Sequence, residues 1–155
     1  MDADCIIKLA KSGLKEAVCS AWRIHIPRLV ETEVVTMGAG RPDSELVRNN
    51  INADQITVHD HEIKFGDQEK GEDAVLELFR HGEYNAIASD DARFLKRLRV
   101  LSVPFAVPAI IVVLLYRDGV LNETTAREAL EKLRYHISPE QYATGVLMLT
   151  GGGAV

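Results

Sequence analysis

The sequence has few cysteines, and its opening residues are unlike those of a secretory signal. Cys5 and Cys19 are the only cysteines in 155 residues, too few for the disulfide framework that stabilises small secreted domains. The chain opens with MDADCIIKLAKSG, which carries acids where a signal peptide would carry basic residues. These two absences predict a protein of the reducing cytoplasm.

The sequence also lacks a long hydrophobic run and an excess of positive charge. Its most apolar stretch is PFAVPAIIVVLLYRDG, which has about a dozen consecutive apolar residues and is interrupted by Pro108, whereas a membrane-spanning helix needs about 20. We therefore predict a buried helix and no membrane partner. The formal net charge is −5, so nucleic acid would have to bind through a local basic patch.

The composition that remains is that of an ordinary globular domain. Apolar residues make up 46% of the chain and charged residues 26%, and this length is sufficient to bury a core without disulfides. We predict a single domain over residues 1–155. It would have an α/β core over 1–120, C-terminal helices over 121–150 and a flexible tail over 151–155.

Short apolar runs alternate with helical patterns along the chain. Strands are predicted, from apolar or alternating runs, at residues 23–27, 55–62, 84–89 and 103–108. Helices are predicted, from apolar periodicity, at residues 28–38, 43–52, 70–82, 91–99, 109–119, 122–137 and 138–149. The alternation predicts an α/β fold with three α/β/α layers, a mainly parallel central sheet and a helical C-terminal end. In such folds ligands bind at the carboxyl ends of the strands.

Several predicted helices begin with residues that favour capping. Asp43 or Ser44 is the expected N-cap of the second helix of that series, and Asn122 is the expected N-cap of a later one. The last helix opens with Ser138 and Pro139 and has Gln141 three residues after the serine, the pattern of a capping box.

Acidic side chains occur next to the predicted strand ends and helix starts. Asp2 opens the chain, Glu33 lies on the helix after the first strand, Glu72 starts a later helix, and Asp90 and Asp91 follow the third strand. Carboxylates from such positions can converge on one point, where their hard oxygens suit Mg²⁺ or Mn²⁺. Without a cation, the cluster would repel itself and its pKa values would rise.

This order of acids resembles the PIN domain, a family of metal-dependent nucleases, and in particular its VapC-like ribonucleases. The family's opening Asp and apolar helix resemble DADCIIKLAKSG, and its strand-Pro-helix segment, in which the second Glu is functional, resembles IPRLVETEVV with Glu33. The helix that begins with the third acid resembles GEDAVLELFRHG with Glu72. The strand end with a hydroxyl residue and the fourth acid resembles IASDDARF, in which Ser89 is the hydroxyl residue.

The spacing to the aromatic Phe94 favours Asp91 over Asp90 as the fourth acid. The helical ending of one PIN subgroup is similar to VPFAVPAIIVVLLYRDGVLNETTAREALEKLR. Members of the family normally have a hydrophobic strand before the first Asp, whereas in this sequence only Met1 precedes Asp2, which leaves Asp2 at risk of fraying.

The resemblance implies hydrolysis of RNA phosphodiester bonds with the help of Mg²⁺ or Mn²⁺. The implied catalytic acids are Asp2, Glu33, Glu72 and Asp91. The same four acids and Asp90 would be the metal ligands. The implied supporting residues are Asp4, Asp73 and Ser89. The implied RNA-binding residues are Arg93, Lys96 and Arg97, within about two helical turns of the acids.

The resemblance also implies partners. Many small PIN-domain ribonucleases are toxins paired with an antitoxin protein, although a stand-alone domain fits an RNA-processing enzyme equally well. The apolar C-terminal helices further predict a homodimer. Its contact would come from AIIVVLLY or from the last helix.

Other interpretations of these residues stay open. Asp90 and Asp91 are good N-caps for the helix that follows, and its basic residues are also typical of a solvated face. The opening DAD resembles haloacid-dehalogenase-like phosphatases, with Asp2 as nucleophile and Asp4 as acid/base, although no Gly-Thr follows it. A metal-poor PIN-like binding module is a further possibility.

Two histidines allow one more type of metal site. His59 and His61 would point to the same side of the second predicted strand, where they could bind a transition metal. No further ligand lies near them in the sequence, so a transition-metal site is the minor alternative.

Overall fold

The structure is a computed structural model that describes residues 1–60 and 70–151. The strands are β1 (Ile24–Pro27), β2 (Ile56–His59), β3 (Ile87–Ala88) and β4 (Phe105–Ala106). The first helices are α1 (Ala3–Lys11), α2 (Lys15–Ala21), α3 (Arg28–Glu31), the π-helix η1 (Thr32–Thr36) and α4 (Pro42–Asn52). The later helices are α5 (Gly71–His81), α6 (Ala92–Val100), α7 (Pro108–Arg117), α8 (Glu123–Leu133) and α9 (Pro139–Thr150). Alternation of helices and parallel strands confirms the predicted α/β class.

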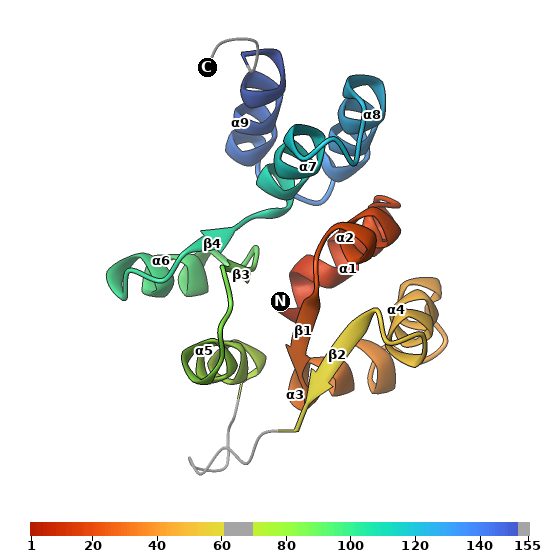
Figure 1. Cartoon of the computed structure of the whole chain (residues 1–155), viewed down its shortest axis with the longest axis vertical. Helices are drawn as coiled ribbons and strands as arrows, with labels where there is room; N and C mark the ends of the chain where they lie inside the picture. Colours follow the sequence, from red (N-terminus) through yellow and green to blue (C-terminus); the bar gives the residue numbers. More distant parts are fainter. Residues whose placement is uncertain (61–69, 152–155) are drawn as a thin grey trace.

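The parallel strands form two pairs. In one pair β1 lies beside β2, and in the other β3 lies beside β4. Figure 1 shows α1 to α4 around the first pair, α5 and α6 beside the second pair, and α7 to α9 as a helical group at one end. Helix α5 packs on both β1 and β3, so it spans the two pairs.

The first two residues of the chain connect the two pairs. The amino group of Met1 donates to the carbonyl of His25 on β1 at 3.0 Å. The N–H of Asp2 donates to the carbonyl of Ala88 on β3, also at 3.0 Å. Met1 and Asp2 therefore occupy a short strand position between β1 and β3, where Figure 1 places the N-terminus.

The core is made of apolar helix faces. On α6 the buried residues are Phe94, Leu95 and Leu98, the spacing of one face of a helix. Helix α7 is the buried helix that its composition predicts, and it packs on α8 and α9. Most of AIIVVLLY is therefore used inside the chain, and the prediction that it supplies a dimer contact is wrong for its buried residues. Within residues 1–60 and 70–151, no helix has the length and apolar character to cross a membrane.

Strand lengths and one helix differ from the predictions. The third and fourth strands each contain only two residues, and the second ends at His59. The helix predicted at 28–38 is divided, because α3 continues as the π-helix η1 and then as turns. The end of the predicted second strand and most of the tail, residues 61–69 and 152–155, lie outside the described residues.

Helix caps follow the sequence more closely, with two exceptions. Asn122 caps α8, and Ser138 caps α9 by accepting the Gln141 N–H at 3.2 Å. The side chain of Gln141 donates to Asp90 instead of returning to Ser138, so the capping box is only half formed. The prediction for α4 is also wrong, because its N-cap is Arg41 and the helix begins at Pro42, whose φ suits a first position.

Candidate active site

Asp2 is firmly held where α1 begins. It is the N-cap of that helix, its Oδ1 accepts the N–H of Cys5 at 2.9 Å, and only 5% of the residue is exposed. Burial raises the pKa of Asp2, while hydrogen bonds from Ser89 and Cys5 oppose that rise. Asp2 is therefore an ordered, buried acid, contrary to the risk of fraying.

Ser89 links Asp2 to Asp91. It is fully buried just after β3, hydrogen bonds to the Asp2 side chain, and accepts the N–H of Asp91 on its Oγ at 3.2 Å. Asp91 caps α6, since its Oδ1 accepts the N–H of Phe94 at 2.7 Å. The capping interpretation of Asp91 is thus confirmed, and the same bonds hold Asp91 close to Asp2 through one shared hydroxyl group.

Glu33 lies on the π-helix η1, a rare wide turn that is frequent at functional sites. Its carboxylate accepts the backbone N–H of Gly71 at the start of α5. The approach is close, because a Cβ added to Gly71 would lie 2.9 Å from Oε2 of Glu33. Burial raises the pKa of Glu33, and the negative charge of Asp2 raises it further.

Glu72 joins the cluster from the first turn of α5. Its pKa is raised first by burial and then by the charge of Asp91, with a smaller contribution from Asp2. The charge of Asp2 thus raises the pKa of both Glu33 and Glu72, and the charge of Asp91 raises the pKa of Glu72. Each of the four predicted catalytic acids therefore interacts with another member of the set. The structure brings together, from four separate segments, the carboxylates of Asp2, Glu33, Glu72 and Asp91.

The four carboxylates are close enough to repel one another, but they do not form a ready coordination sphere. In the part of the chain that the structure describes, no group of three or more His, Cys, Asp or Glu side chains is placed to hold a metal ion. Asp2, Glu33 and Asp91 each accept a backbone N–H instead. Their donor chemistry nevertheless fits Mg²⁺ or Mn²⁺, since all four offer carboxylate oxygens and a cation would relieve their repulsion.

The raised pKa values have a consequence for stability without metal. Carboxyl groups with a higher pKa in the folded state than in the unfolded state bind more protons when folded. The contribution of Asp2, Glu33 and Glu72 to the free energy of unfolding is therefore present at low pH. It is lost as the pH rises from about 4 through the raised pKa values.

Asp90 has a different environment from Asp91. Its side chain is only 4% exposed, and Lys8 of α1 forms an ion pair with its Oδ2. Its Oδ1 accepts a hydrogen bond from the Gln141 side chain of α9. Both oxygens are thus used to join α1, the end of β3 and α9, which favours Asp91 over Asp90 as the ligand.

Sequence reasoning missed Lys8 and the contact made by Gln141. Lys8 had a weak signal, since it is a cation within an apolar helix and follows Asp4 by one helical turn. Gln141 had none, because it is separated from Asp90 by 51 positions and only the tertiary structure brings them together.

The predicted supporting acids Asp4 and Asp73 form ion pairs with residues outside the four-acid cluster. Asp4 is 61% exposed and pairs with Lys8 at 2.7 Å, so it does not share a buried pocket with Asp2 as a phosphatase acid/base pair would. Asp73 pairs with Arg97 of α6, one of the predicted RNA-binding residues.

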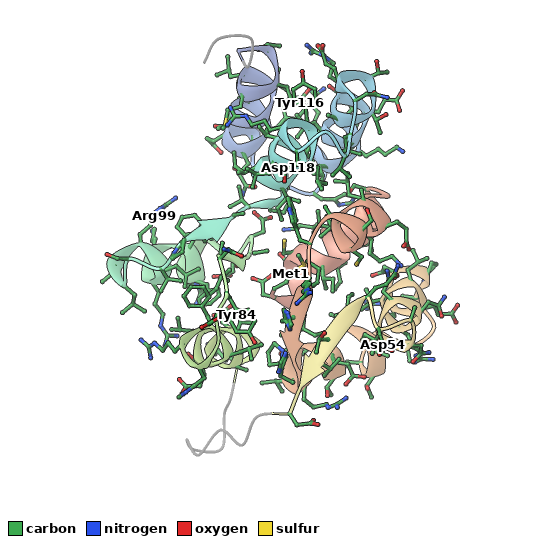
Figure 2. All side chains as sticks on the ribbon, in the orientation of Figure 1. Met1, Asp54, Tyr84, Arg99, Tyr116 and Asp118 are labelled. Atoms are coloured by element: carbon green, nitrogen blue, oxygen red, sulfur yellow. The ribbon has the colours of Figure 1, made fainter. Side chains whose placement is uncertain are left out.

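The other two predicted RNA-binding residues, Arg93 and Lys96, are exposed on α6. Nearby, Arg99, which Figure 2 labels, places its guanidinium over the Phe105 ring, 5.4 Å from the ring centroid. The exposed face of α6, the helix that Asp91 caps, is thus basic. Both a solvated helix face and a phosphate-binding surface have this property.

The histidine of β2 meets a different partner from the one predicted. Nε2 of His59 lies 2.9 Å from Nδ1 of His25 on β1, and the Tyr84 ring lies 5.1 Å from the His25 ring. Burial and the neighbouring His59 lower the pKa of His25, which favours its neutral form. His61, the other half of the predicted transition-metal pair, lies outside the described residues.

Replacing Gly71 with Ala is expected to displace the Glu33 carboxylate while leaving the fold intact. The added methyl group would meet only the flexible end of the Glu33 side chain, and Ala favours a helix. Any metal-induced rise in melting temperature should therefore shrink in Gly71→Ala, although the metal-free variant should melt within about 2 °C of the wild type. Thermal melts with and without Mn²⁺ check this, and an unchanged metal response would exclude a role for Gly71 in positioning Glu33.

Comparisons with known proteins add a finding about the whole chain. A family model described as a PIN domain matches residues 1–148, a span that includes all four acids of the cluster. The match does not separate VapC-like toxins from other members. A search of curated proteins and a search of solved structures each found no match.

Proposed function

The chain belongs to the PIN-domain family, and on this premise we propose that it is a metal-dependent endoribonuclease. The observation that carries the proposal is the coupled cluster of Asp2, Glu33, Glu72 and Asp91. Burial raises the pKa of Asp2, Glu33 and Glu72, and the charges of other cluster members raise the pKa of Glu33 and Glu72 further, a cost that a functional cation site explains. Ordinary surface acids avoid such an arrangement.

In this proposal the four carboxylates hold Mg²⁺ or Mn²⁺. A bound ion of this kind supplies an activated water and stabilises charge on the phosphate. The chain's own contribution is to orient the ligands. Ser89 positions Asp2 and Asp91, and the Gly71 N–H positions Glu33.

RNA would approach along the basic face of α6. Arg93 and Lys96 are exposed there, in the first turns after Asp91. Arg97 is half-exposed and partly neutralised by Asp73, so we assign it a smaller share of phosphate binding. Such contacts to the backbone give affinity that falls with salt and little sequence preference.

An antitoxin protein and a homodimer are extensions of the same proposal. We propose an antitoxin partner because the chain resembles small PIN-domain ribonucleases, many of which are paired with one. We propose α9 as the dimer contact because its Leu147 is 69% exposed. A reducing cytoplasm fits the two cysteines, which are free in the structure.

The test is cleavage of an end-labelled single-stranded RNA. We expect cutting by the wild type in Mn²⁺ or Mg²⁺ and none in EDTA. Asp2→Asn should reduce the rate at least about 100-fold, since removing even an outer partner of a catalytic metal costs 10–100-fold. Asp4→Asn is the matched control, because Asp4 lies two residues away but is exposed and paired with Lys8, and it should cut like the wild type.

Two further substrates distinguish the alternatives. A DNA of the same sequence tests the preference for RNA, and a phosphate monoester tests the phosphatase interpretation. Turnover of the monoester alone, lost in both Asp2→Asn and Asp4→Asn, would replace the nuclease with a phosphatase. No turnover of any substrate in the presence of metal would leave a binding module.

A further inference from the structure

Two histidines meet on the β1–β2 pair, and neither belongs to the four-acid cluster. The register places His25 opposite Thr57 and Pro27 opposite His59. Because side chains alternate along a strand, Thr57 and His59 project to the same side of β2, so His25 and His59 share one face of the pair. Their rings meet there, with Nδ1 of His25 2.9 Å from Nε2 of His59. The contact therefore follows from the β1–β2 ladder alone.

Two aromatic side chains pack against the histidine rings. The centroid of the Tyr84 ring lies 5.1 Å from that of His25 and 6.5 Å from that of His59, edge-on to the His59 ring. Phe79 of α5 in turn lies 6.4 Å from Tyr84. All four side chains are partly exposed. The histidines are thus held by packing, which lowers the entropy cost of ordering them around a ligand, and they remain open to solvent.

The donor atoms of this pair differ in chemistry from those of the acids. Neutral imidazole is a good ligand for Ni²⁺, Cu²⁺ and Zn²⁺, whereas Mg²⁺ and Mn²⁺ prefer oxygen ligands. Burial and the neighbouring His59 lower the pKa of His25, so at neutral pH its ring is in the unprotonated form that binds metal. The histidine pair and the carboxylates therefore favour different ions.

The spacing of the two nitrogens suits neighbouring positions around one ion. Two nitrogen ligands about 2.0–2.1 Å from an ion, and at right angles to each other, lie about 2.9 Å apart. This is the observed separation of Nδ1 of His25 and Nε2 of His59. At the tetrahedral angle the same ligands would lie about 3.3–3.4 Å apart. The pair therefore fits the square-planar or tetragonal geometry of Ni²⁺ and Cu²⁺ better than the tetrahedral geometry of Zn²⁺.

Metal binding requires only a small rearrangement of the pair. The ring planes are inclined at 43°, and in the neutral pair one nitrogen donates a hydrogen bond to the other. On binding, that hydrogen moves through solvent to the other nitrogen of its own ring, and the rings turn so that both lone pairs point to the ion. The number of protons on the pair does not change. Among the described residues no third ligand is grouped with the pair, so water completes the coordination.

We propose that His25 and His59 form a binding site for a divalent transition-metal ion, Ni²⁺ or Cu²⁺, with water in the remaining positions. The ion joins β1 to β2 and is separate from the Mg²⁺ or Mn²⁺ of the four acids. The site keeps His59 from the pair that the sequence predicts and takes His25, on the neighbouring strand, as its partner. It does not depend on nuclease activity, because it rests on the geometry of the two strands.

Isothermal titration calorimetry with Ni²⁺ tests the site. The ion is titrated at neutral pH into the whole chain without a histidine tag, in excess Mg²⁺ that occupies the carboxylates. We expect saturable binding of a single Ni²⁺ per chain and a higher melting temperature. His25→Ala and His59→Ala should each weaken the binding at least about tenfold, because each removes one of the two protein ligands.

Matched variants and a spectroscopic measurement separate loss of the ligand from loss of the fold. His136→Ala removes an exposed histidine between α8 and α9 and should bind Ni²⁺ like the wild type. His25→Asn keeps a side chain that can hydrogen bond to His59 but supplies no imidazole, so it should fold normally and still lose affinity. Electron paramagnetic resonance of bound Cu²⁺ counts the coordinated imidazoles. It should show two in the wild type and one in His25→Asn.

Several results would overturn the proposal. One is the absence of Ni²⁺ binding beyond that of the double variant His25→Ala with His59→Ala, and another is an equal loss in His136→Ala. A loss in His61→Ala with none in His25→Ala would restore the pair that the sequence predicts. Binding that Glu33→Gln abolishes and His25→Ala leaves unchanged would place the Ni²⁺ among the four acids. Failure of RNA cleavage alone would leave this site unaffected.

Discussion

Saturating Mn²⁺ is expected to raise the free energy of unfolding by about 2.7 kcal/mol at a metal concentration 100 times the dissociation constant. For a chain of this size that corresponds to a rise in melting temperature of roughly 5–11 °C. The reason is that Asp2, Glu33 and Glu72 carry raised pKa values because of burial and neighbouring charge, and a cation removes the repulsion. Thermal melts at pH 7, with Mn²⁺ or EDTA, measure the gain.

Glu33→Gln makes this prediction specific to the cluster. The variant removes one negative charge beside Asp2, so the metal-free protein should be at least as stable as the wild type at pH 7 while the gain with Mn²⁺ is largely lost. Its metal-free stability should also fall less as the pH rises from about 4.5 to 7, because one raised pKa is gone. Glu31→Gln is the matched control: Glu31 lies two residues away, at the end of α3, and pairs with Arg28 at 3.5 Å.

The outcomes separate a metal site from a structural one. An equal gain with Mn²⁺ in the wild type and Glu33→Gln would place the metal elsewhere, and no gain in the wild type would remove the shared site. A metal-free Glu33→Gln that melts well below the wild type would mean that its hydrogen bond from Gly71 is chiefly structural.

Replacing Lys8 with Met should destabilise the protein by about 3 kcal/mol, the lower end of the cost of leaving a buried charge without its partner. The Asp90 side chain is 4% exposed, and Lys8 supplies the cation at its Oδ2. The lower end applies because Lys8 retains 18% exposure and Gln141 still donates to the other oxygen. Urea unfolding at pH 7 gives the difference, with the slope expected to stay constant.

Lys11→Met is the control for this change, since it removes a cation from an exposed position of the same helix. It should cost less than about 0.5 kcal/mol. The double variant Lys8→Met with Asp90→Asn should recover part of the loss, because the buried charge itself is then gone. Equal effects of Lys8→Met and Lys11→Met would show that the ion pair with Asp90 contributes nothing to the stability of the fold.

Much of the secondary structure and the order of the acids follow from the sequence. The 3.6-residue spacing of Phe94 and Leu98 and the caps at Asp91, Asn122 and Ser138 depend on neighbours within about one helical turn. Local rules of this kind can be applied to the sequence without a structure. The family resemblance adds the order of the acids, and the match over residues 1–148 shows the family itself.

Other features depend on residues far apart in the chain. Asp90 and Asp91 are adjacent and chemically identical, yet one is paired with Lys8, 82 positions away, while the other caps its own helix beside Ser89. The lengths of the strands also depend on residues far apart in the chain, because β3 and β4 are extended only where they pair with each other.

The sequence by itself determined most of the helices, the caps at Asp91, Asn122 and Ser138 and the candidate acids, because these arise from contacts between near neighbours. Only the tertiary structure decided which acid is held in an ion pair and that Met1 and Asp2 join the two strand pairs. The physical reason is that ion pairing of buried groups and hydrogen bonding between strands depend on which segments meet in space.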